Sequence, residues 1–297
     1  ISKKFKVPVN LLVKENSKAT EFLKENKNID EIIYLDRGNQ NKKGKHDGVL
    51  GSLKLIKDIK KYKFDKIFIF NSSIRFRLIA KLSGIKDIYQ YPLFSKKNQH
   101  IINTAKEFIR KKLDLDINND PTIITEEKLI NNAKLKYDID NNKLNILLGI
   151  GGSGPTKQIP SKTFINVVKK ILKEKECKFF LATGQNENEQ KILKEITNSE
   201  FSEKCIALDK LSINEILPII KNCHIAICND SSFSHLSSAL GIKTIVLMAD
   251  TPLIYGSYST KMYPIIPVGE QTVNHNTRGK NKISSDEIFE KFKEIIL

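Results

Sequence analysis

The chain has 297 residues, of which 40% are hydrophobic, enough for the cores of two ordinary domains and too many for a disordered chain. No apolar run reaches the roughly 18–20 residues needed to span a bilayer, and no signal peptide opens the sequence. The 50 lysines and arginines exceed the 34 acidic residues, and the formal net charge of +16 favours anionic partners such as nucleic acid, a membrane surface or a phosphorylated substrate. Because the excess is mostly lysine spread along helix faces, a compositional bias of the source explains the same charge.

The four cysteines lie in or beside apolar segments, at Cys177, Cys205, Cys223 and Cys228. None forms a Cys-x-x-Cys pair, so neither a zinc site nor a disulfide framework is indicated. We therefore expect four reduced, buried thiols.

The first half of the chain alternates between predicted strands and predicted helices. Residues 1–5 resemble the end of a helix; strands are predicted at 7–13, 31–35 and 67–70, and helices at 50–62 and 74–82, the last stopped by Gly84. In the helix at 50–62, the apolar positions 50, 53, 55, 56 and 59 form roughly one stripe, with lysines opposite, and are expected to face the core. Such alternation predicts a parallel sheet covered by helices on both faces.

A segment that breaks this rhythm separates the two halves. It contains a basic helix near 100–113 and a second helical piece near 126–135. The polar run at 138–143 follows, and we place the domain boundary there, which gives domains at 1–140 and 141–297.

The second half resumes the alternation. Strands are predicted at 144–148, 177–182, 205–208, 224–228 and 244–248, helices at 162–172, 189–196 and 284–297, and an extended edge segment at 262–269. Ser212 and Glu215 form a capping box that opens another helix. Pro218 lies inside that helix and is expected to kink it or end it early.

The polar cluster 229–232, Asn-Asp-Ser-Ser, lies between two of these strands and opens a short helix that Gly241 ends. Ligands bind at the carboxyl ends of strands in open parallel sheets, and the N–H groups that open a helix suit an anion. Asp230, Ser231, Ser232 and His235 crowd this position. The alternative is structural, with Asp230 or Ser231 capping the helix and His235 satisfied within the fold.

The loop after the strand at 144–148 contains Gly149-Ile150-Gly151-Gly152-Ser153-Gly154, formally a G-x-G-x-x-G motif. A nicotinamide-dependent dehydrogenase must therefore be considered. In that fingerprint, however, the helix opens at the third glycine and an acid follows about 20 residues later. Here Pro155 and Pro160 delay the helix to about Ser161, and the next strand ends without an acid.

Three loops at strand ends together carry what a nucleotide diphosphate needs. The first has glycines, Ser153 and Lys157; the second has Gly184 with Glu187 and Glu189; the third has Asp230, Ser231 and Ser232. Glycines let the backbone approach a phosphate, lysine is a mobile positive charge, and carboxylates can bind ribose hydroxyls. Each glutamate taken alone also fits a solvated charge at the start of a helix.

The order GGSGPTKQIP, TGQNENE, LSINE and NDSSFSHLSSALGIKTIVLM resembles glycosyltransferase family 9, the ADP-heptose:lipopolysaccharide heptosyltransferases. The resemblance covers nearly the whole chain and is most specific at 229–248. Two positions depart from the family pattern, with Ile159 in place of tryptophan and Ser232 in place of glycine.

The resemblance implies an α/β fold of the GT-B class, with two facing Rossmann-like domains, the donor on the C-terminal one and the acceptor on the N-terminal one. Carried over by position, Gly152, Ser153 and Lys157 hold the donor diphosphate, and Ser231 and Ser232 meet it through backbone N–H groups. Glu187 or Glu189 binds the ribose, Leu211 lies against the adenine, Asp230 contacts the sugar hydroxyls, and His235 lines the site.

The implied activity is transfer of heptose or a related sugar from an ADP-sugar to a lipopolysaccharide core acceptor, with inversion of configuration and without a metal or other cofactor. The family's general base is an aspartate in a Gly-Asp loop that has no counterpart in this sequence. We therefore expect a short strand and such a loop upstream of Ile1, and no transfer by the present chain without them.

The implied partners are the nucleotide-sugar donor, a lipid-anchored saccharide and the anionic inner membrane of a Gram-negative-type bacterium, which a monomer would meet from the cytoplasm. Lysines along 54–63 and 106–112 are expected to draw the protein to anionic vesicles. The remaining alternative, a basic nucleic-acid-binding protein, lacks the aromatic-rich basic stretches that stack bases, so we expect no nucleic-acid partner.

Overall fold

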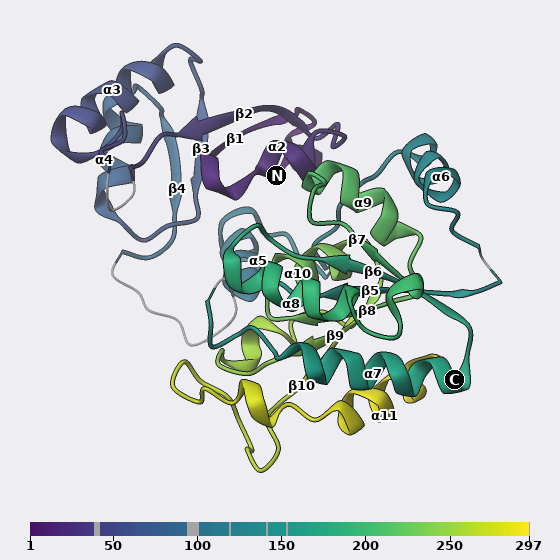
Figure 1. Ribbon diagram of the computed structural model, residues 1–297. Helices are drawn as coiled ribbons and strands as arrows, with labels where there is room; N and C mark the ends of the chain where they lie inside the picture. The colour runs from purple at the N-terminus through teal and green to yellow at the C-terminus, as the bar shows by residue number, and fades with distance from the viewer. Residues whose placement is uncertain (39–41, 94–100, 119, 141, 153, 297) are drawn as a thin grey trace. The chain divides into compact units, whose positions relative to one another are not determined.

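The computed structural model describes the chain except for residues 39–41, 94–100, 119, 141, 153 and 297 (Figure 1). The chain forms two compact units, residues 1–20 with 27–118 and residues 21–26 with 119–297. Helix α6 (Glu127–Lys136) belongs to the second unit, although it precedes the polar run at which the sequence places the boundary. The assignment of acceptor and donor roles to two domains stays a prediction.

The first unit contains two pairs of parallel strands. These are β1 (Val9–Lys14) with β2 (Ile29–Leu35), and β3 (Lys66–Ile69) with β4 (Asp87–Gln90). Its helices are α1 (Ser2–Phe5), α3 (Gly48–Lys60), α4 (Ile74–Leu82) and α5 (Ile101–Leu113), with α2 (Ala19–Leu23) at the division between the units and a 3-10 turn at Glu15–Ser17. One small core joins both strand pairs to α3 and α4, through buried Leu35, Leu55, Ile59, Ile69 and Ile79.

Most predicted elements of this unit are confirmed, including α4 with Gly84 beyond its end at a φ of 86°. The strand β4 was missed, because four residues are too few for a visible alternation. The expected stripe of α3 is wrong at two positions. Gly51, Leu55 and Ile59, four residues apart, face inward, whereas Leu50 and Leu53 lie to the side and are exposed.

The second unit is built on a six-stranded parallel sheet in the order β10-β9-β8-β5-β6-β7. Its strands are β5 (Leu144–Gly149), β6 (Cys177–Ala182), β7 (Cys205–Ala207), β8 (Ile225–Asn229), β9 (Lys243–Leu247) and β10 (Met262–Ile265). The chain proceeds outward from β5 to β7, then returns to the other side of β5 to form β8. The strand order therefore reverses between β5 and β8, and in doubly wound sheets ligands bind at the carboxyl ends on either side of such a reversal.

Helices cover both faces of this sheet (Figure 1). Besides α6 they are α7 (Ser161–Glu174), α8 (Glu187–Thr197), α9 (Ile213–Lys221), α10 (Ser232–Ala239) and α11 (Ser285–Ile296), with 3-10 turns at Ser202–Lys204, Leu253–Tyr255 and Lys280–Lys282. Alternate residues of each strand enter opposite cores. Ile146 and Leu148 pack with Phe164 of α7 and Phe292 of α11, whereas Leu147 packs with helix α9 on the other face.

Helix α9 begins with the predicted capping box, in which Ser212 and Glu215 satisfy each other's backbone N–H groups. Of the two outcomes expected of Pro218, the early end does not occur, because the helix continues to Lys221 with Pro218 buried inside it; the kink stays a prediction. The apolar neighbours of Pro218 in the core keep the helix in place, although a proline cannot donate a backbone hydrogen bond.

Each of the four cysteines is free, as predicted. Burial raises the pKa of the Cys177 thiol to about 12 and that of the half-buried Cys205 thiol to about 11. These groups stay protonated near neutral pH and serve as packing rather than as nucleophiles. Among the described residues, none of the helices combines the length and apolar composition that crossing a bilayer requires.

The fold predicts that the C-terminal helix is part of the main core. Phe292 on α11 is fully buried, and its replacement by alanine should lower the free energy of unfolding by about 3–5 kcal/mol. Phe289, on the same helix and only half-buried, is the matched control, and its replacement by alanine should lower the free energy of unfolding clearly less. Urea unfolding of Phe292→Ala and Phe289→Ala measures both, and equal losses would contradict the packing described.

Candidate functional site

The candidate site lies at the carboxyl edge of the six-stranded sheet, where the strand order reverses. The loop 150–160 follows β5, residues 183–186 follow β6, and Asp230 and Ser231 follow β8. Because β5 pairs with both β6 and β8, the three loops are neighbours at this edge. The structure thus brings together residues as far apart in sequence as Ile150 and Asn229, which are separated by 79 positions.

An ion pair joins the first and third of these loops. The Lys157 Nζ donates to the Asp230 Oδ2 at 2.8 Å, and the side chains of the two residues are 23% and 6% exposed. A carboxylate this buried needs a compensating charge, and Lys157 supplies it. Two residues that the sequence assigns to ligand binding therefore lie in contact.

The start of helix α10 faces the same edge. Ser231 is its N-cap, in an extended conformation with φ −148° and ψ 175°, and its side chain makes no capping hydrogen bond. The Ser231 Oγ is buried and has no hydrogen-bond partner among the described residues. The first N–H groups of a helix have no intrahelical acceptor, and the first turn, from Ser232, contains no acid. This combination suits an anionic ligand that accepts hydrogen bonds.

Glu189 joins the loops after β5 and β6. Its buried carboxylate accepts a hydrogen bond from the Gly152 N–H at 2.6 Å through Oε1 and one from the Asn186 side-chain amide through Oε2. Asn186 in turn caps helix α8 by accepting from the Glu189 N–H at 3.0 Å. Of the two glutamates offered by the sequence as ribose ligands, Glu189 already has both oxygens bonded, whereas Glu187 is exposed on the first turn of α8.

His235 stacks on Tyr258, with ring centroids 5.7 Å apart, and its Nδ1 lies 2.8 Å from the Tyr258 Oη. Burial lowers the pKa of His235; the Asp230 charge opposes this shift and the Lys157 charge adds to it. Burial and the nearby Asp120 raise the pKa of Tyr258 to about 12. His235 is therefore a neutral hydrogen-bonding group within electrostatic reach of the Lys157–Asp230 pair.

Two further residues shape the loop after β5, and sequence reasoning did not assign them. The fully buried Asn229 donates to the Ile150 carbonyl at 2.8 Å, and Gln158 donates to the Gly152 carbonyl at 3.1 Å. Both lie inside the motifs that the sequence singles out, so their position was visible but their role as backbone anchors was not. Tyr258 had no such signal, since it lies 23 residues beyond His235.

The other predicted site residues are placed as follows. Leu211 follows β7, is half-buried and packs on the core that contains Leu208 and Ile216. Ser153 lies outside the described residues. No cluster of three or more His, Cys, Asp or Glu side chains suited to a metal ion occurs within the described part of the chain.

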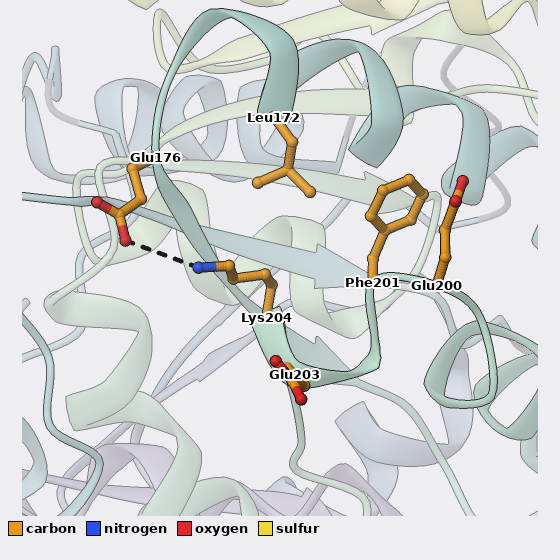
Figure 2. A pocket seen from close by; sticks show the side chains of 6 residues that line it. All are labelled: Leu172, Glu176, Glu200, Phe201, Glu203 and Lys204. Atoms are coloured by element: carbon orange, nitrogen blue, oxygen red, sulfur yellow. Dashed lines mark ion pairs between the residues drawn. The ribbon is translucent and has the colours of Figure 1, made fainter.

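A cavity of about 390 Å³ lies at the opposite edge of the sheet (Figure 2). Its lining residues precede the strands β6 and β7 or end helix α7: Leu172, Glu176, Glu200, Phe201, Glu203 and Lys204. Lys204 pairs with Glu176 at 3.6 Å across it. None of the predicted site residues lines this cavity, so it is separate from the candidate site.

The fold and the position of the site define an α/β protein of the GT-B class with parallel sheets. Residues 53–283 match the family described as Glycosyltransferase family 9 (heptosyltransferase), and the chain belongs to this family. It is 24% identical over 301 residues to lipopolysaccharide heptosyltransferase 1 of Campylobacter coli, covering 92% of this chain and 84% of that protein.

Two solved structures share the fold. The family 9 glycosyl transferase of Veillonella parvula superposes with a TM-score of 0.75 at 17% identity, covering 97% of this chain and 88% of that one. The ADP-heptose lipopolysaccharide heptosyltransferase II of E. coli does so with a TM-score of 0.72 at 14% identity, covering 97% and 89%.

The contact between Glu189 and the glycine loop predicts the effect of adding one methyl group. A Cβ at Gly151 would lie 2.7 Å from the Glu189 Oε1 and 3.3 Å from the Gly184 N, so Gly151→Ala must displace the carboxylate from the Gly152 N–H. We expect a loss of about 1–3 kcal/mol in unfolding free energy, because a buried donor loses its acceptor. Gly154→Ala is the matched control, since a Cβ there meets nothing within 4 Å. Thermal or urea unfolding that shows equal stability for both variants would refute the role given to Glu189.

The lowered pKa of His235 predicts a pH dependence of stability. The folded pKa of His235 lies below the ordinary value of 6.5, so in this pH range the unfolded chain binds more protons than the folded one. The stability that His235 contributes is therefore present above pH 6.5 and is lost as the pH falls from 6.5 through the lower, folded pKa. His235→Gln should therefore show a shallower fall in unfolding free energy between about pH 7 and pH 5 than the parent. His275→Gln, at an exposed position, is the control and should retain the parent slope. An unchanged slope in His235→Gln would contradict the assignment.

Proposed function

We propose that this protein transfers heptose or a related sugar from an ADP-sugar to a lipopolysaccharide core acceptor, with inversion at the transferred carbon. Membership of glycosyltransferase family 9 supports sugar transfer, and similarity to lipopolysaccharide heptosyltransferases supports heptose as the sugar and lipopolysaccharide as the acceptor. The observation that carries the donor assignment is the convergence of Lys157, Asp230 and the α10 N-terminus at the strand-order reversal.

The donor diphosphate is assigned to the space between the glycine loop and helix α10. There the backbone N–H groups of Ser231 and Ser232 and the ammonium of Lys157 supply positive charge where the leaving diphosphate gains negative charge. Gly152 lets the loop backbone approach the phosphates, and Ser153 is assigned with Lys157 to the diphosphate. Neither a metal nor another cofactor is part of this proposal, since amides and lysine take the stabilising role.

The remaining donor contacts follow from the order of the loops along the sheet edge. Glu187, exposed at the start of α8, is the preferred ribose ligand, and Glu189 holds the loop beneath it. Leu211, further along the edge after β7, is assigned to the adenine. Asp230 takes the sugar hydroxyls and His235 lines the same space.

Lys157 has two tasks in this arrangement. It neutralises Asp230, and it must also meet the diphosphate, so the bound donor shares one ammonium between a carboxylate and a phosphate. An ammonium has three donors and a flexible stem, which makes this sharing feasible for lysine.

Inversion requires a single displacement, in which the acceptor hydroxyl loses a proton to a base while it attacks the sugar. Asp230 is paired with Lys157, and Glu189 is bonded to the loop, so we assign the base to neither.

The dehydrogenase alternative is disfavoured by the start of helix α7. The helix begins at Ser161, seven residues after Gly154, so its N-terminus is not at the third glycine of the motif. The strand β6 ends at Ala182 and is followed by Thr183 and Gly184, where a nicotinamide enzyme would carry an acid.

The donor assignment predicts the behaviour of Lys157→Ala. Removal of a charge-assisted contact should weaken ADP binding about tenfold or more. Isothermal titration calorimetry with ADP, UDP and GDP measures which nucleobase the parent protein prefers. The same measurement with ADP gives the loss of affinity in Lys157→Ala. Lys162→Ala, five residues away and exposed, is the control and should keep the parent affinity.

Because Lys157→Ala also leaves Asp230 without its cation, the variant is compared with Asp230→Asn and with the double variant. Asp230→Asn should restore stability to Lys157→Ala without restoring ADP affinity. If a correctly folded Lys157→Ala protein bound ADP as tightly as the parent, the donor site would lie elsewhere.

A further inference from the structure

Helices α3 and α4 expose a set of apolar side chains that the core does not use. The six residues, here called the apolar ridge, are Val49 (80% exposed), Leu50 (74%), Leu53 (56%), Ile74 (48%), Leu78 (52%) and Leu82 (61%). Single exposed leucines are common, but a contiguous set on neighbouring helices marks an interaction site.

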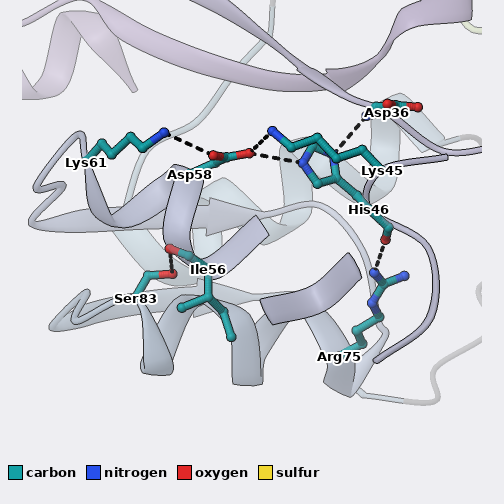
Figure 3. A network of polar contacts seen from close by, with 8 residues as sticks. All are labelled: Asp36, Lys45, His46, Ile56, Asp58, Lys61, Arg75 and Ser83. Carbon is teal, nitrogen blue, oxygen red and sulfur yellow. Dashed lines mark hydrogen bonds and ion pairs between the residues drawn. The ribbon is translucent and has the colours of Figure 1, made fainter. Parts of the chain in front are cut away.

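The two helices pack side by side, which makes the ridge one surface. The Arg75 Nε donates to the Ser52 Oγ at 2.9 Å, and the Ser83 Oγ donates to the Ile56 carbonyl at 3.4 Å, while Arg75 also reaches the His46 carbonyl (Figure 3). On α3, Ser52 and Ile56 contact α4, and positions 49 and 53 of the ridge lie next to them on the helix surface. On α4, positions 74, 78 and 82 recur every four residues along the same side.

The apolar ridge lies on the side of helices α3 and α4 that faces away from the strands. On the strand β3, Ile67 and Ile69 point into the core beneath α3 and α4, whereas Phe68 points to the other face and meets Phe5 and Tyr89. Helix α1, which carries Phe5, is thus on the opposite face of the strands and does not cover the ridge.

Basic side chains flank the ridge on both helices. Exposed Lys54, Lys57 and Lys60 lie on α3, and exposed Arg77 and Lys81 lie on α4, which contains no acid. The one acid of α3, Asp58, is bonded to Lys45, Lys61 and His46 on another side of the helix (Figure 3). A second copy of this surface would therefore meet it with like charge.

We propose that the apolar ridge docks on an anionic phospholipid bilayer, with its leucines in the boundary between headgroups and acyl chains and the flanking lysines and arginine at lipid phosphates. Apolar residues at the centre and basic residues at the margin are what an interfacial surface requires. The inference deepens the proposed function, on which its purpose rests, by naming the surface through which the protein reaches a lipid-anchored acceptor.

The apolar ridge changes the salt dependence of vesicle binding that surface lysines alone would predict. Attraction between lysines and lipid phosphates is screened beyond about 10 Å at 0.1 M salt. Inserted leucines add a contribution that salt does not screen. Binding to anionic vesicles should therefore weaken as salt is added but should not vanish. The binding that persists at high salt should depend on the apolar ridge.

The test is co-sedimentation with vesicles of phosphatidylglycerol and phosphatidylethanolamine, and with vesicles of phosphatidylcholine. The parent protein should bind the anionic vesicles, and the double variant Leu53→Gln/Leu78→Gln should bind them at least about tenfold more weakly, since two leucines no longer leave water. Leu135→Gln, at a position 81% exposed on α6, is the control and should bind like the parent. All substituted positions are exposed, and circular dichroism verifies that each variant is folded.

Equal sedimentation with neutral and anionic vesicles, or equal binding of the double variant and the parent, would overturn the proposal. A concentration-dependent dimer in ultracentrifugation that the double variant abolishes, without vesicle binding, would assign the ridge to a second copy instead. ADP affinity is measured on the same proteins. Retained ADP binding without vesicle binding rejects the membrane surface alone, whereas vesicle binding without ADP binding rejects the donor site alone.

Discussion

The adjacency of β5 and β8 in the sheet is the constraint on which the candidate site depends. Since β6 pairs with the other side of β5, the loops that follow β5, β6 and β8 are neighbours at the carboxyl edge of the sheet. Three contacts that shape the site join segments at the ends of different strands: Lys157 to Asp230, Glu189 to Gly152, and Asn229 to Ile150. The glycines matter because the loops approach so closely that a Cβ at Gly151 would meet the Glu189 carboxylate. Parallel pairing thus determines which side chains can act together.

Periodicity and capping chemistry predicted most elements, because they act within one segment. The capping box at Ser212 and the stop at Gly84 both depend on neighbours in sequence. The errors occurred where tertiary packing decided the outcome. The strand β4 exists because β3 offers it a partner.

The same division separates what was foreseen in the site from what was not. Its residues could be predicted as a group, since each follows a strand of a parallel sheet. Their partners could not, because Glu189 and Glu187 are only two residues apart and the helix turns one inward and leaves the other exposed. On α3, a stripe of apolar letters likewise did not distinguish the core-facing Leu55 from the exposed Leu53.

The two strand pairs of the first unit imply that this unit opens at a lower free energy than the second unit. Among the described residues, β1–β2 and β3–β4 are not hydrogen-bonded to each other, and one small core supports them both. The six-stranded sheet instead has two large cores, one on each face. Isolated two-stranded pairs are marginal in water, so backbone amides of β1 to β4 should exchange with solvent deuterium through low-energy openings that leave β5 and β8 protected. The chain can then lose one cooperative folding unit while the candidate site of the other persists.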